Sequence, residues 1–329
     1  MNESEERTLQ GVIPGHLHGW RLDQALASLF ADFSRSRLQD WIRAGRVELD
    51  GRGCRPRERV CGGQQVSLRI VPEAETRLQG EDLPLQVLYA DGDLLVIDKP
   101  AGIVVHPAVG NPAGTLVNAL LHHFPELARL PRAGLVHRLD KNTSGLLVIA
   151  RSERAHTTLV RQLQARSMSR EYLAVAQGVL LSGGTIDAPL GRHPVDRKRI
   201  AVIAGGRRAV THYRVLERYP AHTLLRVQLE TGRTHQIRVH FAHIRHPLVG
   251  DPSYGGRFRL AAGIGEPLRQ ALRAFPRQAL HARRLALVHP AKGERLEWQS
   301  SPPADLAALI AALRVDAGTG QSLGEGHGA

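Results

Sequence analysis

The sequence contains few cysteines, few aromatic residues and no long apolar run. Only Cys54 and Cys61 occur among 329 residues, without the spacing of a zinc site, which indicates a reducing compartment. Aromatic residues make up 4% of the chain, which argues against a broad base-stacking platform. The sequence shows neither a membrane-spanning run nor an amphipathic basic helix, and the first residues, MNESEERTLQ, are too acidic for a signal peptide. We therefore expect a cytoplasmic protein that binds no membrane.

The motifs of nucleotide-cofactor and zinc sites are also missing. The sequence has no Walker loop, G-x-G-x-x-G, CxxC pair or HExxH. His240 and His243 stand three residues apart, but no Glu or Cys ligand follows them, so RNA contacts or packing suit these histidines better than a metal. We expect neither a metal nor an organic cofactor.

Positive charge is what the chain has in excess. Lys and Arg number 44 against 31 acidic residues, which gives a net charge of +13 and a pI near 10.8. Such an excess indicates a polyanionic partner, and without membrane features the partner is nucleic acid. Arginines gather on one short predicted helix, and the loop RHPVDRKRIAVIAGGRRA suits a nucleic-acid backbone, although both could equally be solvated surface. The candidate phosphate contacts are Arg21, Arg35, Arg37, Arg43, Arg46, Arg197, Lys198 and Arg199.

Composition and turn signals divide the chain into five segments. Residues 1–14 and the Gly-rich tail 316–329 are predicted to be disordered. Residues 15–75 contain two helices, LDQALASLF and SRSRLQDWIRAG, and two strands, VELDG and QQVSLRI, so we expect a small α/β unit. Ser34 or Ser36 is the expected cap of the second helix. A polar linker, 76–84, then leads into a larger domain over 85–315.

Strands mostly follow strands in the larger segment. LQVLYADGDLLVIDKP contains two strand-like runs around a turn, AVTHYRVLERY and HTLLRVQLE form another pair, and RLALVHP pairs with RLEWQS. Helices such as SERAHTTLVRQLQAR, capped by Ser152, are interspersed irregularly. Because strict alternation of strand and helix is absent, we expect an α+β domain with a mixed, largely antiparallel sheet.

The stretch VHRLDKNTSGLLVIA places an aspartate at the edge of a rigid core. Asp140 lies in a polar loop directly before a run that is apolar at every position, as in a strand buried on both faces. Arg138 and Lys141 flank it, and neighbouring cations hold a carboxylate ionised and orient it. An ionised, oriented carboxylate can act as nucleophile or general base. From this stretch alone, however, a turn residue with surface ion pairs is the more frequent outcome.

Two distant segments carry further candidates. In TGRTHQIRVHFAHI, Thr234 is a plausible helix cap, Arg233 lies in the preceding turn, and Arg238 lies on a different face from the apolar Ile237 and Phe241. In SREYLAVAQG, Tyr172 opens a strand, where it could stack on a base or simply be a half-buried sheet residue.

These segments together carry a family resemblance. GWRLDQALASLF and SRSRLQDWIRAGRVELDG resemble an S4 domain, a small RNA-binding module. GLVHRLDKNTSGLLVIA, REYLAVAQG and TGRTHQIRVHFAHIRHPLVGDPSYG, in this order, closely resemble the RluA-type RNA pseudouridine synthases, and the match spans about residues 18–313. The chain departs from the family pattern at Arg170, where lysine is usual, and at Arg245, where glycine is frequent.

The resemblance implies a pseudouridine synthase catalytic domain that isomerises uridine in RNA without a cofactor. The S4-like unit makes the chain most similar to members that modify a stem-loop of large-subunit ribosomal RNA, free or in an assembling subunit, and we expect a monomer. Asp140 matches the essential aspartate, which either attacks C1′ or abstracts a sugar proton. Tyr172 matches the tyrosine that packs on the uracil. Arg138 matches the arginine expected near the flipped nucleotide, and Arg238 matches the arginine that pairs with the aspartate. Arg233 is a second candidate for that contact or for phosphate.

Two other functions compete with this one. A ribosomal RNA-binding protein without activity would need no Asp140, Tyr172 or Arg238, so their presence argues against it. A nucleoside hydrolase would need a second carboxylate or an activated water. Asp98 and Asp251 are candidates for that carboxylate, but nothing in the sequence places either one beside Asp140.

Overall fold

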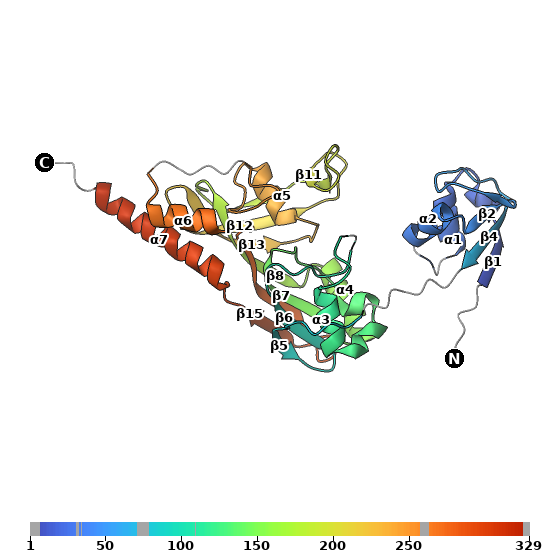
Figure 1. The fold of residues 1–329 in the computed structure, drawn as a ribbon, viewed down its shortest axis with the longest axis horizontal. Helices are drawn as coiled ribbons and strands as arrows, with labels where there is room; N and C mark the ends of the chain where they lie inside the picture. Colours follow the sequence, from blue (N-terminus) through green and yellow to red (C-terminus); the bar gives the residue numbers. More distant parts are fainter. Residues whose placement is uncertain are drawn as a thin grey trace. The chain divides into compact units, whose positions relative to one another are not determined.

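The computed structural model describes residues 7–30, 33, 35–70, 79–108, 110–256 and 263–324 (Figure 1). The chain divides into two compact units, residues 1–77 and 78–329, and each has its own hydrophobic core. Within the described ranges, no helix combines the length and the apolar composition that crossing a membrane requires.

The first unit packs two helices on a four-stranded antiparallel sheet of order β1-β4-β2-β3. Its core includes Leu26, Trp41 and Leu68, all at most 1% exposed. Gly45 follows the second helix at φ +70, a conformation that favours glycine and ends the helix where the sequence predicts. The elements are β1 (Arg7–Val12), α1 (Leu22–Leu29), α2 (Arg35–Arg43), β2 (Val47–Leu49), β3 (Arg52–Gly53) and β4 (Gln65–Ile70).

Two expectations for this unit need correction. Residues 7–12 were expected to be disordered, but they form β1, because six residues pair with β4 and the following Ile13 is buried. Residues 1–6 lie outside the described part of the chain. Ser36 lies inside α2 and therefore is not its cap, while Ser34 is outside the described residues.

The second unit is built on a nine-stranded sheet of order β5-β6-β7-β14-β8-β13-β12-β9, with β15 also paired to β14. Among the described strands, β7 and β14 form the one parallel pair, so the sheet is mixed and largely antiparallel as predicted. Its strands are β5 (Val87–Ala90), β6 (Leu94–Lys99), β7 (Ser144–Ala150), β8 (Ser169–Gln177), β9 (Gly184–Asp187), β12 (Val210–Arg218), β13 (His222–Leu229), β14 (Leu280–Val288) and β15 (Arg295–Gln299). A separate hairpin pairs β10 (Leu190–Arg192) with β11 (Ile200–Val202).

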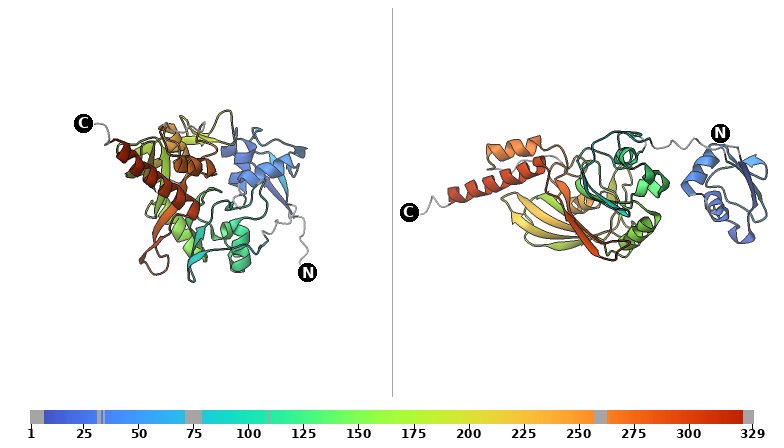
Figure 2. Two further views of the ribbon diagram at one scale, coloured as in Figure 1. Left: turned by 60° about the vertical axis from the view of Figure 1, so that its left-hand side comes forward. Right: turned by 90° about the horizontal axis from the view of Figure 1, so that it is seen from below.

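Helices cover both faces of this sheet, which is why the central strands are apolar at every position. Alternate residues of a strand point to opposite faces. In β7 all seven residues are buried: Leu147 and Ile149 join the core under α3 and α5, and Leu146 and Val148 join the core under α4. Helices α6 and α7 lie side by side over a third core (Figure 2). The helices are α3 (Leu116–His123), α4 (Glu153–Gln164), α5 (Gln236–His243), α6 (Glu266–Ala274) and α7 (Ala304–Gly324).

The boundaries of the second unit differ from those expected. The predicted linker 76–84 is partly packed, since Gln79 accepts a hydrogen bond from Asn118 at 2.8 Å and the Glu81 carboxylate accepts one from Gly114 at 3.0 Å. Residues 71–78 lie outside the description. The tail was expected to be disordered from 316, but α7 runs to Gly324, because Asp316 accepts a hydrogen bond from Gly265 and Ala317 packs on the core. Residues 325–329 are not described.

Two backbone segments approach closely in the centre of the sheet at Gly145, just after the Asp140 loop. Its φ is +111, and a Cβ there would lie 2.3 Å from the carbonyl oxygen of Ala282 on β14. We predict that Gly145→Ala lowers the free energy of unfolding by about 3 kcal/mol, because the energy of the strained backbone adds to the energy of the steric clash. Chemical denaturation measures this. Gly92→Ala, where a Cβ meets no atom within 4 Å, is the matched control, and an equal loss in both variants would contradict the prediction.

Candidate active site

A cavity of about 920 Å³ lies where the loop before β7, the first half of β8 and the start of α5 meet. The sequence-predicted site residues come from three segments of the chain, and the fold brings all five of them to the lining of this one cavity. These residues are Arg138, Asp140, Tyr172, Arg233 and Arg238.

Buried partners hold the loop that carries Asp140. The Lys141 carbonyl accepts hydrogen bonds from Lys99 at 3.1 Å and from the Gly102 amide at 2.9 Å. The Asn142 carbonyl accepts one from Arg277 at 3.2 Å. The Asp140 side chain itself is 16% exposed, so the loop is rigid while its carboxylate reaches the cavity.

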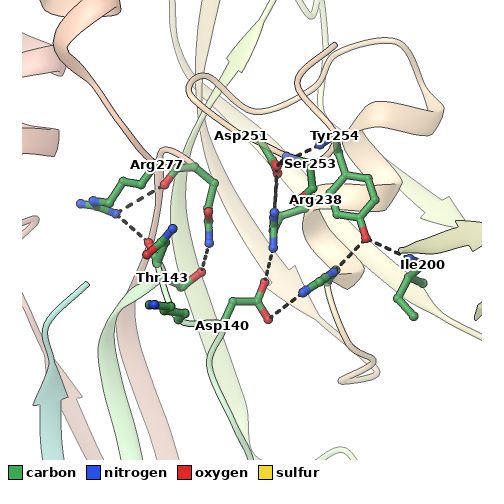
Figure 3. Close-up of polar contacts among 12 residues, drawn as sticks. Asp140, Thr143, Ile200, Arg238, Asp251, Ser253, Tyr254 and Arg277 are labelled. Atoms are coloured by element: carbon green, nitrogen blue, oxygen red, sulfur yellow. Dashed lines mark hydrogen bonds and ion pairs between the residues drawn. The ribbon is translucent and has the colours of Figure 1, made fainter. Parts of the chain in front are cut away.

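Arg238 joins two carboxylates (Figure 3). Its Nε and Nη2 donate to Asp251 at 2.7 and 2.8 Å in a bidentate pair, and its Nη1 donates to Asp140 Oδ2 at 3.0 Å. Asp251 also accepts from the amides of Ser253 and Tyr254 at 2.9 and 3.0 Å. Asp251 is therefore saturated and does not line the cavity, whereas Asp140 keeps an oxygen for other partners. This excludes Asp251 as the second reacting carboxylate of a hydrolase.

The charges in this network stabilise one another. Burial acts to raise the pKa of Asp251, but the hydrogen bonds and the charge of Arg238 outweigh it, so that pKa is lowered. Burial acts to lower the pKa of Arg238, but the hydrogen bonds and charges of Asp251 and Asp140 outweigh it, so that pKa is raised. Both groups are ionised at neutral pH, and the guanidinium side chain is 6% exposed. A buried guanidinium with two fixed acceptors cannot rotate away, so it holds Asp140 in one orientation.

Tyr172 lies on β8 and is 5% exposed in the core that α5 covers. Burial, and to a smaller extent the charge of Asp140, raises its pKa, while Arg170 opposes. The phenol is therefore neutral and presents an apolar ring with one hydroxyl to the cavity.

Sequence reasoning missed Lys99, which is fully buried at the end of β6. Its ammonium donates to the carbonyls of Pro100, Ile103 and Lys141, which ties two loops together below the cavity. Burial lowers its pKa to about 7, and the charge of Asp140 opposes this. The signal for it was a charged pair, Asp98 and Lys99, directly after the apolar run LLVI. Asp98, the other carboxylate considered, accepts a hydrogen bond from Ser300 and does not line the cavity.

The start of α5 also differs from the prediction. The cap is His235 at φ +56, not Thr234, and Gln236 instead accepts from the Arg233 amide at 3.0 Å. His235 lies beside the site, with Nε2 at 3.9 Å from Asp140 Oδ1. Arg245, where the family frequently has glycine, has φ +65. Glycine adopts this left-handed backbone conformation with less strain than arginine.

The histidines of this segment have ordinary hydrogen-bond partners. His240 contacts Thr211 at 2.9 Å and the Ala188 carbonyl at 3.0 Å, and His246 contacts the Gln177 carbonyl at 2.9 Å. Across the described ranges, no group of three His, Cys, Asp or Glu side chains could hold a metal ion.

The candidate phosphate contacts lie outside the cavity. Arg197, Lys198 and Arg199 are exposed on the hairpin formed by β10 and β11. In the first unit, Arg21 and Arg35 donate to the buried Asp23 at 3.0 and 2.8 Å, so part of their charge is compensated. Arg43 pairs with Asp40 at 2.6 Å, Arg46 lies between α2 and β2, and the side chain of Arg37 is outside the description.

We predict that Asp251→Asn destabilises the protein by about 3 kcal/mol at pH 7, because it leaves the Arg238 guanidinium buried with one carboxylate. The folded pKa of Asp251 is lowered, so its contribution is present above the unfolded value near 3.8 and is lost as pH falls through the folded value. The difference from the wild type should therefore shrink below pH ~4. Denaturation at several pH values measures it.

The control is Asp82→Asn, because the side chain of Asp82 is 82% exposed. Its effect should stay within about 0.5 kcal/mol at every pH. Equal losses in the two variants at pH 7 would show that the bidentate pair adds nothing to stability.

Comparison with known proteins agrees with this geometry. The model of the RNA pseudouridylate synthase family matches residues 93–243, which include the cavity, and the S4 domain model matches residues 20–66. The human protein RNA pseudouridylate synthase domain containing 1 superposes with a TM-score of 0.54 at 26% identity, over 71% of this chain and 89% of that one.

Relatives of higher identity cover nearly the whole chain. A ribosomal large subunit pseudouridine synthase D from Pseudomonas aeruginosa is 57% identical over 92% of this chain and 95% of its own length. The protein of the same name from Escherichia coli (strain K12) is 53% identical over 91% of this chain and 92% of its own. The chain therefore belongs to the RluA-type RNA pseudouridine synthases that carry an S4 domain.

Proposed function

We propose that this enzyme converts uridines in a stem-loop of large-subunit ribosomal RNA to pseudouridine, with Asp140 as the reacting carboxylate. The observation that carries the proposal is the geometry of Asp140. Its Oδ2 accepts a hydrogen bond from Arg238 at 3.0 Å, and its carboxylate lines a cavity that the ring of Tyr172 also lines. The names of the relatives above support the ribosomal substrate. An inactive RNA-binding protein would not need a buried ion network that ends on one carboxylate.

The reaction is an isomerisation, so it needs no oxidant and no added group. The N1–C1′ bond of uridine breaks, the uracil turns over, and C5 bonds to C1′. One proton leaves C5 and one is gained at N1, so atoms and charge balance. Asp140 either attacks C1′ or abstracts a sugar proton. Both routes need a carboxylate with a free oxygen, and Asp140 has one because Arg238 occupies Oδ2 only.

Tyr172 is proposed to pack against the uracil. Because burial raises the pKa of Tyr172, its phenol stays protonated and is a poor proton acceptor before RNA binds. Stacking, rather than proton removal, is therefore the role that the free enzyme favours for it. Its hydroxyl oxygen can assist the loss of the C5 proton once the base has turned over.

The target uridine has to leave the RNA stack, because C1′ is not accessible within a helix. A cavity of about 920 Å³ is large enough for a nucleotide. Arg138 and Arg233 are exposed at the cavity and can contact the flanking phosphates. Extrusion costs a few kcal/mol, less in a loop than in a duplex.

The remaining phosphate contacts are proposed on both units. The arginines of the S4 unit and the hairpin of β10 and β11 supply cations, and the net charge of +13 favours association with RNA. We propose a monomer in the cytoplasm that acts on free ribosomal RNA or an assembling subunit.

We predict that Asp140→Asn lowers the rate of pseudouridine formation by about 10,000-fold or more, because the amide cannot replace an ionised carboxylate. RNA affinity should stay within about threefold, since the contacts to phosphate remain. Tritium release from RNA labelled at C5 of uridine measures the rate. Asp98→Asn is the matched control, because Asp98 does not line the cavity. Normal turnover by Asp140→Asn would overturn the assignment.

A second prediction concerns the hairpin. Replacing Arg197 and Lys198 together by Ala should weaken RNA binding and reduce the slope of log K against log salt by about 1.5, because two phosphate contacts are lost. Titrations at several salt concentrations measure the slope. Arg295→Ala on β15, an exposed cation that does not line the cavity, is the control. An unchanged slope in the double variant would show that the hairpin does not touch phosphates.

A further inference from the structure

A chain of hydrogen bonds leads from the hairpin to Asp140 through Tyr254. The amide of Ile200 on β11 donates to the Tyr254 hydroxyl oxygen at 3.0 Å. The same hydroxyl lies 2.8 Å from Nδ1 of His235. Because the oxygen already accepts from Ile200, the hydroxyl hydrogen is available to donate to Nδ1.

This direction of donation fixes the form of His235. If Nδ1 accepts from Tyr254, the proton of the neutral ring is on Nε2. Nε2 lies 3.9 Å from Asp140 Oδ1, while Arg238 contacts Oδ2 at 3.0 Å. Each oxygen of Asp140 thus faces its own donor, but the donor from His235 is about 1 Å too distant for a hydrogen bond.

His235 has two features of a residue that the fold holds under strain for a function. Its φ is +56, which is uncommon for a residue with a side chain, and it caps α5 without a side-chain hydrogen bond to the helix. Burial lowers the pKa of His235, against the charge of Asp140, so the ring is neutral at pH 7. The charged and titratable groups that face it are Asp140, Arg238, Asp251, Arg138 and Tyr254.

Tyr254 also ties the hairpin to α5 by packing. Its ring is 7% exposed and lies between two guanidinium groups, those of Arg199 and Arg238, at 5.1 and 5.0 Å. Ile200 and Val202 of β11 pack in the same small core. A movement of the hairpin would therefore shift Tyr254, which contacts His235 with both its hydroxyl and its ring.

We propose that Tyr254 and His235 are positioning residues that complete the orientation of Asp140 when RNA engages the hairpin. Contact of RNA with Arg197, Lys198 and Arg199 shifts the base of the hairpin, and Tyr254 carries the shift to His235. Nε2 of His235 then comes within hydrogen-bond distance of Asp140 Oδ1 and donates to it. Catalytic hydrogen bonds are often long in the free enzyme and shorten in the complex. The inference rests on the proposed role of Asp140.

The experiment compares single-turnover rates of the full chain at saturating large-subunit ribosomal RNA. Tyr254→Phe keeps the ring and removes the hydroxyl. His235→Asn suits the left-handed backbone but is too short to reach Asp140. Each variant should lower the rate about tenfold, with the Kd for RNA within about twofold. The double variant should also lose only about tenfold, because both changes break the same chain of contacts.

The pH profile separates positioning from a merely structural role. Donation by the Tyr254 hydroxyl to Nδ1 favours neutral His235, so its removal should raise the pKa of that histidine. In Tyr254→Phe the acid limb of the rate profile should move to higher pH by about one unit, because His235 becomes cationic and pairs with Asp140. The double variant should lack this shift, since it has no imidazole at 235.

Tyr219→Phe is the matched control, because Tyr219 is 5% exposed and donates to Glu217 at 2.9 Å outside the cavity. Its rate and pH profile should equal those of the wild type. The inference is overturned if either single variant has the wild-type rate, or if the double variant loses about a hundredfold. In both cases an inactive Asp140→Asn leaves the proposed function standing, whereas an active one overturns that function as well.

Discussion

The guanidinium of Arg238 lies between two carboxylates that have unequal partners. Asp251 accepts four hydrogen bonds, two from Arg238 and two from backbone amides, and is 6% exposed. Asp140 accepts one from Arg238 and reaches the cavity. Three buried charges are costly to desolvate, and the bidentate pair with Asp251 is what offsets that cost. Asp251 therefore holds Arg238, whereas Asp140 keeps an oxygen free, as its proposed role as the reacting carboxylate requires.

The central sheet keeps this arrangement rigid. β7 is buried over its whole length, and the parallel pair that it forms with β14 fixes the chain just after the Asp140 loop. Lys99 and Arg277 hold the carbonyls of that loop from below. The hairpin of β10 and β11 lies outside this sheet and is joined to α5 through Tyr254. The site therefore combines a fixed carboxylate with a neighbouring hairpin that contacts it through Tyr254 and His235.

Local patterns predicted most of the elements. Alternation and apolar runs located β6, β7, β8 and the pair β12–β13, and Ser152 caps α4 as expected, accepting from the Ala155 amide at 3.1 Å. The predictions were wrong where long-range partners decide the conformation. Residues 7–12 are polar enough to look disordered, but pairing with β4 satisfies their backbone groups. Asp316, within α7, accepts a hydrogen bond from Gly265, about fifty residues earlier in the chain.

The sequence by itself determined the chemistry: the net charge indicated a polyanionic partner, and three motifs predicted Asp140, Tyr172 and Arg238. Only the tertiary structure decided which groups touch. Arg238 reaches Asp140 across 98 residues, and Asp251 and Tyr254 enter the network from the loop after α5. The reason is physical: the period of a helix or strand gives the face on which a side chain lies, whereas hydrogen-bond partners depend on how distant segments pack.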